Sequence, residues 1–495
     1  MSSSRRSSMS SVSSQTSLQS SLDSRTALIL VPDPEDTPLS PQSPFHFSDD
    51  DELEEEIASQ SEQLWSSSIP PLAPVVVFLY LLSPYLKLGA LLLPQWHQPL
   101  RIGLPVLFLL AALAAFTRQI WYLLAVYLRK ADLEEVVLDA LARGRGRETR
   151  REILRTIIRL FNGVSRILLA TMYLRYSVEV LLPLFPDNLA VSYRVIVTAV
   201  LAILVLPLYA ASSLASRRII YAAWTSIAAY VLWLCFVVYS SAHGTLTGGF
   251  TLPTGSTWTG ITTLAFTFTS SSTLPLFASL KGTTQPVTTS QRGSRSFIVL
   301  SAISVAVALA LVLPVVVSFS RDRLQHASGL SINQWMASLN AIILVPSIPA
   351  ILITSSTLRI PHAIQRFIGF SISKAILFFL VVLLSFAPEP IFSVLTDILL
   401  FMMLFGTFAL PAIIHITIYE FKQPLSIIIP STPHRRVSSD GSANSHDELL
   451  QRKERSLQKL RLWKRLAWDI GVWLLLVPIC LVGFVWLGGR IIQKW

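Results

Sequence analysis

The sequence predicts an all-α polytopic membrane protein with about 11 transmembrane helices, and three observations support this fold class. Hydrophobic residues make up 52% of the 495 residues, charged residues only 14%, and the mean hydropathy is +0.56. A soluble domain has roughly 25% charged residues. The charges are gathered into a few blocks, and the stretches between them contain runs of about 20 apolar residues, enough to cross a hydrocarbon core. Because these runs lack the two-residue alternation of barrel strands, we expect a helix bundle.

The chain divides into four predicted segments. Residues 1–70 form a Ser-rich tail with an acidic run at 49–56. We expect this tail to be disordered, because it cannot bury enough apolar surface to offset its ordering entropy. It is either a solvated tail or a regulatory tail, phosphorylated or used in sorting. Residues 72–418 form a ten-helix core, 419–469 a cytosolic loop with an amphipathic helix, and 470–495 the eleventh helix with a short C-terminus.

The apolar runs define the predicted spans. They are 72–98, 102–128, 157–182, 191–215, 219–241, 258–280, 296–319, 334–357, 366–388, 391–418 and 470–490. Loops from even to odd spans are rich in Lys and Arg, above all 129–157 and 419–469, whereas the opposite loops hold little beyond Arg101, Arg321 and Arg323. This asymmetry predicts a cytosolic N-terminus.

Two short helices are predicted outside the spans. Residues 131–142 repeat apolar residues at helical spacing, which predicts a short interfacial helix. Residues 446–468 are charged and amphipathic, which favours a helix lying on the membrane surface. Residues 431–447 are predicted to be a flexible linker.

No motif indicates catalysis, a metal or a cofactor, so we expect no enzyme and no catalytic residues. The sequence has no phosphate-binding Gly-rich loop, no metal-spaced His/Cys cluster and no nucleophile elbow. Cys235 and Cys480 both lie in apolar runs, where they act as small hydrophobic residues. The net charge of +11 is attributed to basic loops beside anionic lipid headgroups rather than to nucleic-acid binding.

Two predicted spans are interrupted. The first carries Pro84, Gly89 and Pro94, and the sixth carries a Ser/Thr-rich stretch at 267–273 followed by Pro275. Proline removes a backbone donor, and broken helices expose backbone groups that bind solutes in transporters. The alternative is that these residues only kink and pack the helices. Interruptions five spans apart face each other in an inverted five-helix repeat, which favours the binding interpretation.

Charged residues within the spans are the other candidates for function, since charges at membrane depth are costly. They are Lys87, Arg118, Arg166, Arg175, Glu179, Lys374 and Asp397. Arg175 and Glu179, four residues apart, are predicted to pair on one helix. Lys87 lies at the interruption of the first span, where an ammonium either replaces a sodium ion or takes up a proton, or else snorkels to the interface. Tyr173 either closes over a small substrate or packs in the core.

These features resemble the amino acid/auxin permease family of the amino acid–polyamine–organocation superfamily over residues 72–490. In the first span, 87–94 keeps the family's second glycine, last leucine and proline as Gly89, Leu93 and Pro94. In the tenth span, 404–412 closely matches the family's phenylalanine–leucine–proline ending. Further positions similar to the family pattern are Gly103, Thr117, 133–137, 144–147, Arg194, 206–208, 212–214 and 265–266.

The resemblance implies a leucine-transporter-like core of two inverted five-helix repeats plus one extra helix. It also implies proton-coupled or facilitated transport of amino acids, and the Ser-rich tail is similar to that of fungal vacuolar members. A vacuolar membrane is therefore expected, with the plasma membrane as the alternative. By this analogy the substrate site comprises Gly89, Ala90, Phe266, Thr267 and Ser271, with Tyr173 nearby, and Lys87 couples to the ion or proton.

Two other functions remain open from the sequence. The first is an amino acid sensor or scaffold that uses the same bundle without flux and signals to cytosolic regulators through its tail and the loop 419–469. The second is a membrane enzyme, which the lack of clustered His, Asp or Glu disfavours. The expected partners of a carrier are an amino acid, a proton and membrane lipids.

Overall fold

The computed structural model confirms the all-α class for the part of the chain that it describes. The described residues are 71–96, 99–128, 130, 132–142, 148–185, 193–211, 213–243, 257–270, 273–281, 290–319, 332–355, 372–418 and 468–491. Every regular element in these ranges is a helix, and all of them belong to one unit, Glu55–Trp495. The predicted tail 1–70, the linker 431–447 and all but the last residue of the predicted helix 446–468 lie outside the described residues.

The helices follow the predicted spans in order. The first five spans contain α2 (Pro74–Leu82), η1 (Ser83–Leu86), α3 (Leu88–Leu92) and η2 (Leu93–Trp96); α4 (Leu100–Leu128); α6 (Glu148–Leu181) and η3 (Leu182–Leu184); α7 (Tyr193–Tyr209); and α8 (Arg217–Ala242). The next six contain α9 (Thr257–Thr267) and α10 (Thr273–Lys281); α11 (Ser290–Ser318); α12 (Ile332–Leu344), η4 (Val345–Ser347) and α13 (Ile348–Ile353); α15 (Ile372–Ser385); α16 (Glu389–Leu404), η5 (Phe405–Ala409) and α17 (Leu410–Ile416); and η7 (Val472–Leu476) with α19 (Val477–Ile491).

Among the described residues, seven helical segments are long and apolar enough to cross a membrane. They are Pro74–Leu92, Leu100–Leu128, Glu148–Leu184, Arg217–Ala242, Ser296–Ser318, Gln334–Ile353 and Glu389–Ile416. Two shorter apolar helices, Tyr193–Tyr209 and Ser373–Ser385, lie in the predicted fourth and ninth spans. An all-α membrane protein is therefore the class that the helices establish.

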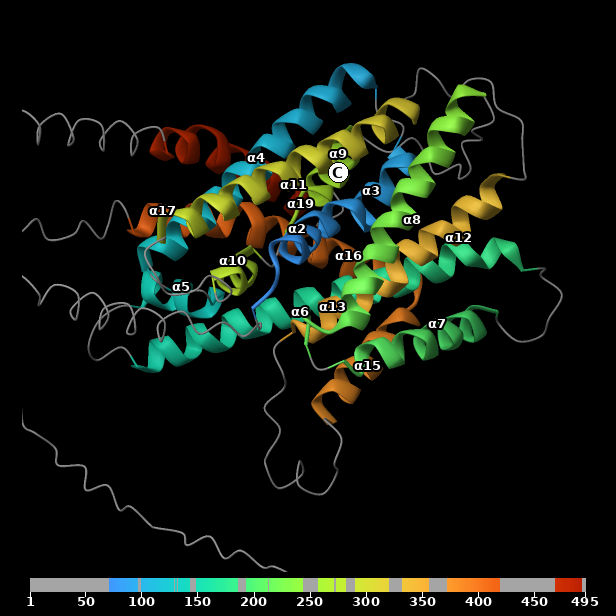
Figure 1. The fold of residues 1–495 in the computed structure, drawn as a ribbon, viewed down its shortest axis with the longest axis horizontal. Coiled ribbons are helices and arrows are strands. Elements are labelled where there is room, and N and C mark those ends of the chain that lie inside the picture. The colour runs from blue at the N-terminus through green and yellow to red at the C-terminus, as the bar shows by residue number, and fades with distance from the viewer. Residues whose placement is uncertain are drawn as a thin grey trace, which may run out of the picture. The chain divides into compact units, whose positions relative to one another are not determined.

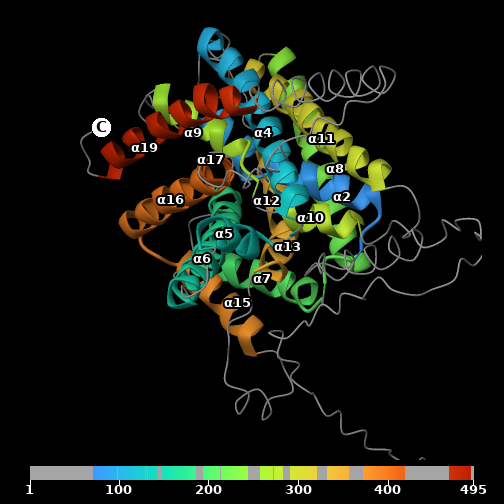
Figure 2. The ribbon, with the colours of Figure 1, turned by 90° about the vertical axis from the view of Figure 1, so that its left-hand side faces the viewer.

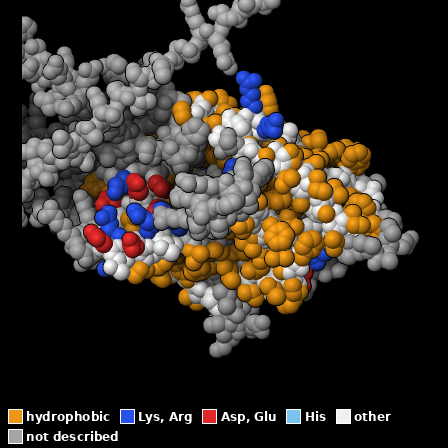
Figure 3. All heavy atoms as spheres, turned by 90° about the horizontal axis from the view of Figure 1, so that it is seen from below, with side chains coloured by type: hydrophobic (Ala, Val, Ile, Leu, Met, Phe, Trp, Pro, Cys, Tyr) orange, Lys and Arg blue, Asp and Glu red, His pale blue; other side chains and the backbone are white. Residues whose placement is uncertain are grey.

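Large apolar side chains cover the outside of the bundle. Ile203, Phe379 and Val485 are 70%, 67% and 69% exposed. In Figure 3 apolar side chains dominate the described surface of one face, and charged side chains gather at one end of it, where α5 and the start of α6 lie. An apolar surface of this extent is unstable in water but well solvated by lipid chains.

The first and sixth spans lie side by side, and α2 is seen next to α10 in both Figures 1 and 2. Helix α2 packs against α10, and α3 packs against α9, so each half of the first span has a partner half in the sixth. Helices α4 and α11 pack against each other and against α2 or α9. The two interrupted segments are therefore enclosed by continuous helices.

Helix α5 (Leu133–Leu141) confirms the short helix predicted at 131–142. Asp132 caps it, its side chain accepting a hydrogen bond from the Glu134 backbone N–H at 3.4 Å. Glu134 also pairs with Arg155 at 2.8 Å and Arg159 at 2.6 Å. These ion pairs fasten α5 to the start of α6, beside the predicted basic loop.

Candidate functional site

The first span is interrupted at the predicted place. Helix α2 ends at Leu82 and becomes a short 3-10 turn that contains Pro84. Lys87 then leaves helical geometry, with φ −110° and ψ −139°, before α3 begins at Leu88. Pro84 has no N–H to donate to the Tyr80 carbonyl, so the α-helical ladder is interrupted at this turn, and Lys87 follows directly after it. Lys87 is buried.

The sixth span is interrupted too. Helix α9 ends at Thr267, and Phe268, Thr269 and Ser270 are not helical. The backbone N–H of Ser270, freed by the interruption, donates to Thr407 Oγ1 at 3.2 Å. Thr407 lies in the π-helical turn of the tenth span, a bulge of the kind that re-aims side chains at functional sites. Ser271, one of the predicted binding residues, lies outside the described residues.

Gly89 and Thr267 bring the two interrupted spans into backbone contact. A Cβ atom on Gly89 would lie 2.5 Å from Thr267 Cα and 2.8 Å from its backbone nitrogen. Only glycine allows this approach. Two residues predicted to hold a substrate therefore touch each other. Ala90, another residue of the predicted substrate site, is fully buried and does not line either of the cavities described below.

A cavity of about 90 Å³ lies on one side of this contact. We call it the N-side cavity, because its lining from the first span comes mainly from the half nearer the start of α2. Lys87, Gly89, Tyr173 and Phe266, all predicted site residues, line it. Its other lining residues are Tyr80, Ser83, Pro84, Arg166, Leu169, Leu214, Thr269, Ser270, Leu276, Ala350, Ile351, Thr354 and Met403.

A second cavity of about 710 Å³, the far-side cavity, lies beyond the contact. In the first span it is lined by Leu88 and Leu92, and in the sixth by Thr259, Thr262, Thr263 and Phe266. The third span contributes 172–182 here and 166–173 to the N-side cavity. In the tenth span, 389–400 line the far-side cavity and Met403 the N-side cavity. The two cavities are thus stacked along the same helices.

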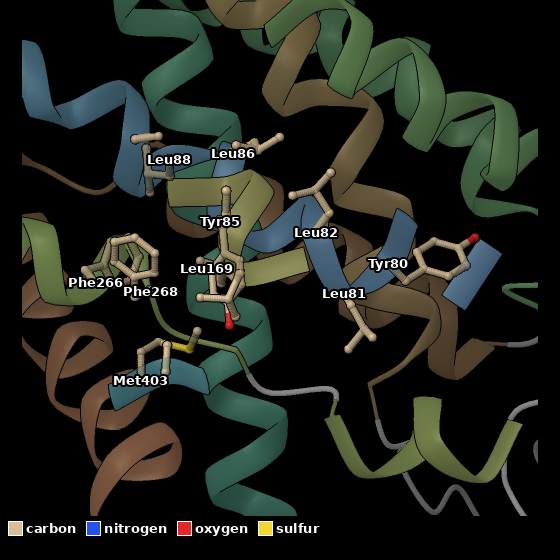
Figure 4. Packing of buried hydrophobic residues seen from close by; sticks show 14 of the residues in the cluster. Tyr80, Leu81, Leu82, Tyr85, Leu86, Leu88, Leu169, Phe266, Phe268 and Met403 are labelled. Carbon is tan, nitrogen blue, oxygen red and sulfur yellow. The ribbon is translucent and has the colours of Figure 1, made fainter. Parts of the chain in front are cut away.

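Of the residues that the structure describes, Phe266 alone lines both cavities. Its side chain is 8% exposed. The next aromatic residue of this segment, Phe268, packs on Tyr85 from the first span with ring centroids 5.5 Å apart (Figure 4). Phe266 therefore borders both cavities, and Phe268 joins the sixth span to the first.

Arg118 of α4 binds both interrupted spans and is 2% exposed. Its guanidinium donates to the Leu81 carbonyl and to Ser304 Oγ, each at 2.7 Å, and to Ser270 Oγ at 3.4 Å. The charge also lies 4.4 Å from the centre of the Tyr85 ring, a cation–π contact. The sequence marks Arg118 as a charge at membrane depth, but its spacing does not reveal that it joins spans one, two, six and seven.

An ion-pair network contributes two carboxylates, Glu179 and Glu389, to the lining of the far-side cavity. Arg175, 1% exposed, pairs with Glu179 at 2.7 Å, as predicted, and with Glu389 at 2.6 Å. It also donates to the Ala387 carbonyl and lies 3.6 Å from the centre of the Phe392 ring. Glu389 was not predicted as a partner, because it lies between two predicted spans where charges are expected in any case.

The sequence matches no protein-family model, and no curated protein matches it. The described fold and site define the class of this chain as an all-α membrane protein with two interrupted, contacting helices and a cavity on either side of that contact.

Proposed function

We propose that this chain is a secondary carrier that moves amino acids across a membrane through the site between its interrupted first and sixth spans, by proton coupling or facilitated transport. The observation that carries this proposal is that two cavities approach Phe266 from opposite ends of the same helices. A carrier must expose one site to each side in turn, and such sites lie where helices are broken. A small rotation of Phe266 and its neighbours would open the proposed substrate site, between the two interrupted spans, to one cavity or to the other.

Pairs of contacting helices support a core of two five-helix repeats. If spans one to five and six to ten had one arrangement, each contact would recur five spans later. The contact between spans five and eight (α8–α12) has its counterpart between spans ten and three (α16–α6). In the same way, α8–α11 (five and seven) corresponds to α17–α4 (ten and two), and α7–α13 (four and eight) to α15–α6 (nine and three). The contacts of the first span, α2–α11 and α2–α8, correspond to those of the sixth, α9–α4 and α9–α16. Because five crossings reverse the chain direction, such repeats are inverted.

The proposal places the N-terminus in the cytosol, on the side of the basic loops. It assigns the chain to the amino acid/auxin permease family as a divergent member with 11 spans, and to the vacuolar membrane or, alternatively, the plasma membrane. The support is the resemblance of residues 87–94 and 404–412 to the family pattern.

Lys87 is proposed to couple transport to protons. It lines the N-side cavity at the interruption of the first span, and no hydrogen bond or ion pair joins its ammonium to another described residue. A buried ammonium that faces a cavity can exchange its proton with water entering from one side. We expect Lys87→Ala to abolish any stimulation of uptake by a pH gradient, whereas equal stimulation in wild type and variant would remove this role.

The decisive experiment is uptake of radiolabelled amino acids into proteoliposomes that contain the purified full-length chain, with protein-free liposomes as control. Ligand binding is measured in parallel as a shift in melting temperature, because a ligand specific for the native state stabilises it. Uptake above the control supports the carrier. Binding with no uptake overturns it.

The same outcome would favour the second candidate, a sensor or scaffold without flux. One observation favours it: at Gly89 the interrupted spans are in direct backbone contact, so no open path joins the two cavities there. A sensor would bind its ligand in the N-side cavity and respond through its cytosolic segments.

A further inference from the structure

The N-side cavity is lined by two buried cationic side chains. Lys87 is 8% exposed and Arg166 is 7% exposed, and they reach the cavity from the first and third spans. None of the lining residues, all drawn from the described ranges, is Asp or Glu. The other polar side chains of the lining carry hydroxyls, those of Tyr80, Ser83, Tyr173, Thr269, Ser270 and Thr354.

A third positive charge stands directly behind this lining. Arg118 donates to Ser270 Oγ at 3.4 Å, so the hydroxyl that faces the cavity is polarised by a guanidinium. Opposing charge comes from Asp132, the capping residue of α5, which interacts electrostatically with Arg166. Lys87 has no such partner among the described residues.

We propose that the N-side cavity is a binding site for a small anion, and that the substrate of this carrier is a small carboxylic acid, acidic amino acids included, rather than a cationic or neutral one. The substrate role rests on the proposed transport function; the preference for anions is a property of the cavity itself.

The physical reason is the cost of an uncompensated buried charge. A cation held away from water without a partner is destabilising, and an anion that enters the cavity supplies the missing partner. A bound ammonium would instead meet Lys87 and Arg166 with no carboxylate in the lining to balance it. The size of the cavity, about 90 Å³, restricts the anion to a small molecule, because the pockets of drug-sized ligands measure roughly 300–1,000 Å³.

The test is isothermal titration of the purified full-length protein with L-glutamate, L-alanine, L-lysine and sodium chloride. We expect glutamate to bind, alanine to bind at least about 10-fold more weakly, a difference of about 1.4 kcal/mol, and lysine not to bind. Alanine or lysine binding as tightly as glutamate would overturn the proposal. Binding of chloride with no binding of glutamate would overturn the assignment of a carboxylic acid to the site, because the cavity would then take an inorganic anion only.

Variants locate the binding site. We expect Lys87→Met and Arg166→Met each to weaken glutamate binding by at least roughly 30-fold, as for loss of one partner of a buried charge pair. Lys374→Met is the matched control: Lys374 lies within the predicted ninth span, bonds weakly to the Ala211 carbonyl at 3.5 Å and does not line the cavity. Lys87→Arg, which keeps the charge, should retain binding and shows whether a loss in Lys87→Met reflects misfolding.

Uptake measurements separate this proposal from the proposed function. Glutamate binding without uptake of any amino acid contradicts the carrier and supports the anion site. Uptake of alanine or lysine without uptake of glutamate supports the carrier and overturns the carboxylic acid as its substrate.

Discussion

Gly89 fixes how closely the interrupted spans approach. A Cβ there would meet the Thr267 side-chain oxygen and two backbone atoms of Thr267, and the backbone atoms cannot rotate away. The family resemblance assigns Gly89 to substrate binding; the structure gives it a packing role as well, because the same residue also borders the N-side cavity.

We expect Gly89→Ala to destabilise the protein by about 1–3 kcal/mol, the usual cost of overpacking a filled core. The measurement is thermal unfolding of the detergent-purified protein. Gly406→Ala is the control, since its Cβ would lie 3.5 Å from a carbon of the Phe161 ring, an ordinary contact. Equal melting temperatures for the two variants would contradict the assigned contact.

Arg118 joins separate spans through the two terminal nitrogens of its planar guanidinium group. Lysine has a single ammonium and cannot reach Leu81 O and Ser304 Oγ with the same geometry. We expect Arg118→Lys to cost about 1–3 kcal/mol for the group left without a donor, and Arg118→Met to cost more. Arg151→Lys at the exposed start of α6 should change the unfolding free energy by no more than about 0.5 kcal/mol. A melting temperature unchanged in Arg118→Lys would show that the contacts contribute nothing.

At the scale of elements, the π-helical turn of the tenth span compensates for the interruption of the sixth. Ser270 has lost its helical acceptor, and Thr407 supplies a side-chain oxygen instead. A backbone N–H that is buried without an acceptor is costly, so interruption and bulge depend on each other.

We expect Thr407→Val, which keeps the shape but removes the acceptor, to destabilise the protein by about 1–3 kcal/mol. Thr417→Val in the same span is the control, since within the described part of the chain its hydroxyl donates to the Ile413 carbonyl of its own helix. Hydrogen exchange at 268–270 should accelerate in Thr407→Val alone. Unchanged hydrogen exchange at 268–270 would contradict the claim that Thr407 stabilises the interruption of the sixth span.

The sequence predicts the elements better than their contacts. Long apolar runs fix the helices, and Pro84 and the Ser/Thr-rich stretch at 267–273 predict both interruptions. Ala90 was expected in the site and is packed away from it, because spacing along one helix does not say which face meets a cavity. The link from Ser270 to Thr407 joins residues 137 positions apart, and no local pattern encodes a contact of that separation.

At the scale of the whole molecule, the two stacked cavities predict separate access from the two sides of the membrane. The chain has only two cysteines, Cys235 and Cys480, so a background with serine at both is simple to prepare. In it, Ser83→Cys should react with a membrane-impermeant thiol reagent from one side only, and Ser393→Cys from the other only.

Reaction of both cysteines from the same side would contradict the stacking of the cavities. Adding Phe266→Ala should increase the reaction of Ser83→Cys from the side of the far-side cavity, because the aromatic ring that borders both cavities is then missing. Phe379→Ala, at an exposed apolar position of α15, is the matched control and should leave the labelling unchanged.

The bonds of Arg118 constrain any motion that alternates between these two forms of access. A single side chain ties the second span to Leu81 in the first, Ser270 in the sixth and Ser304 in the seventh. Those four segments cannot slide past one another without breaking charged hydrogen bonds in a dry interior. They would therefore travel together as one rigid body, and the hinge and sliding surfaces would have to lie where that body meets α8, α16 and α17.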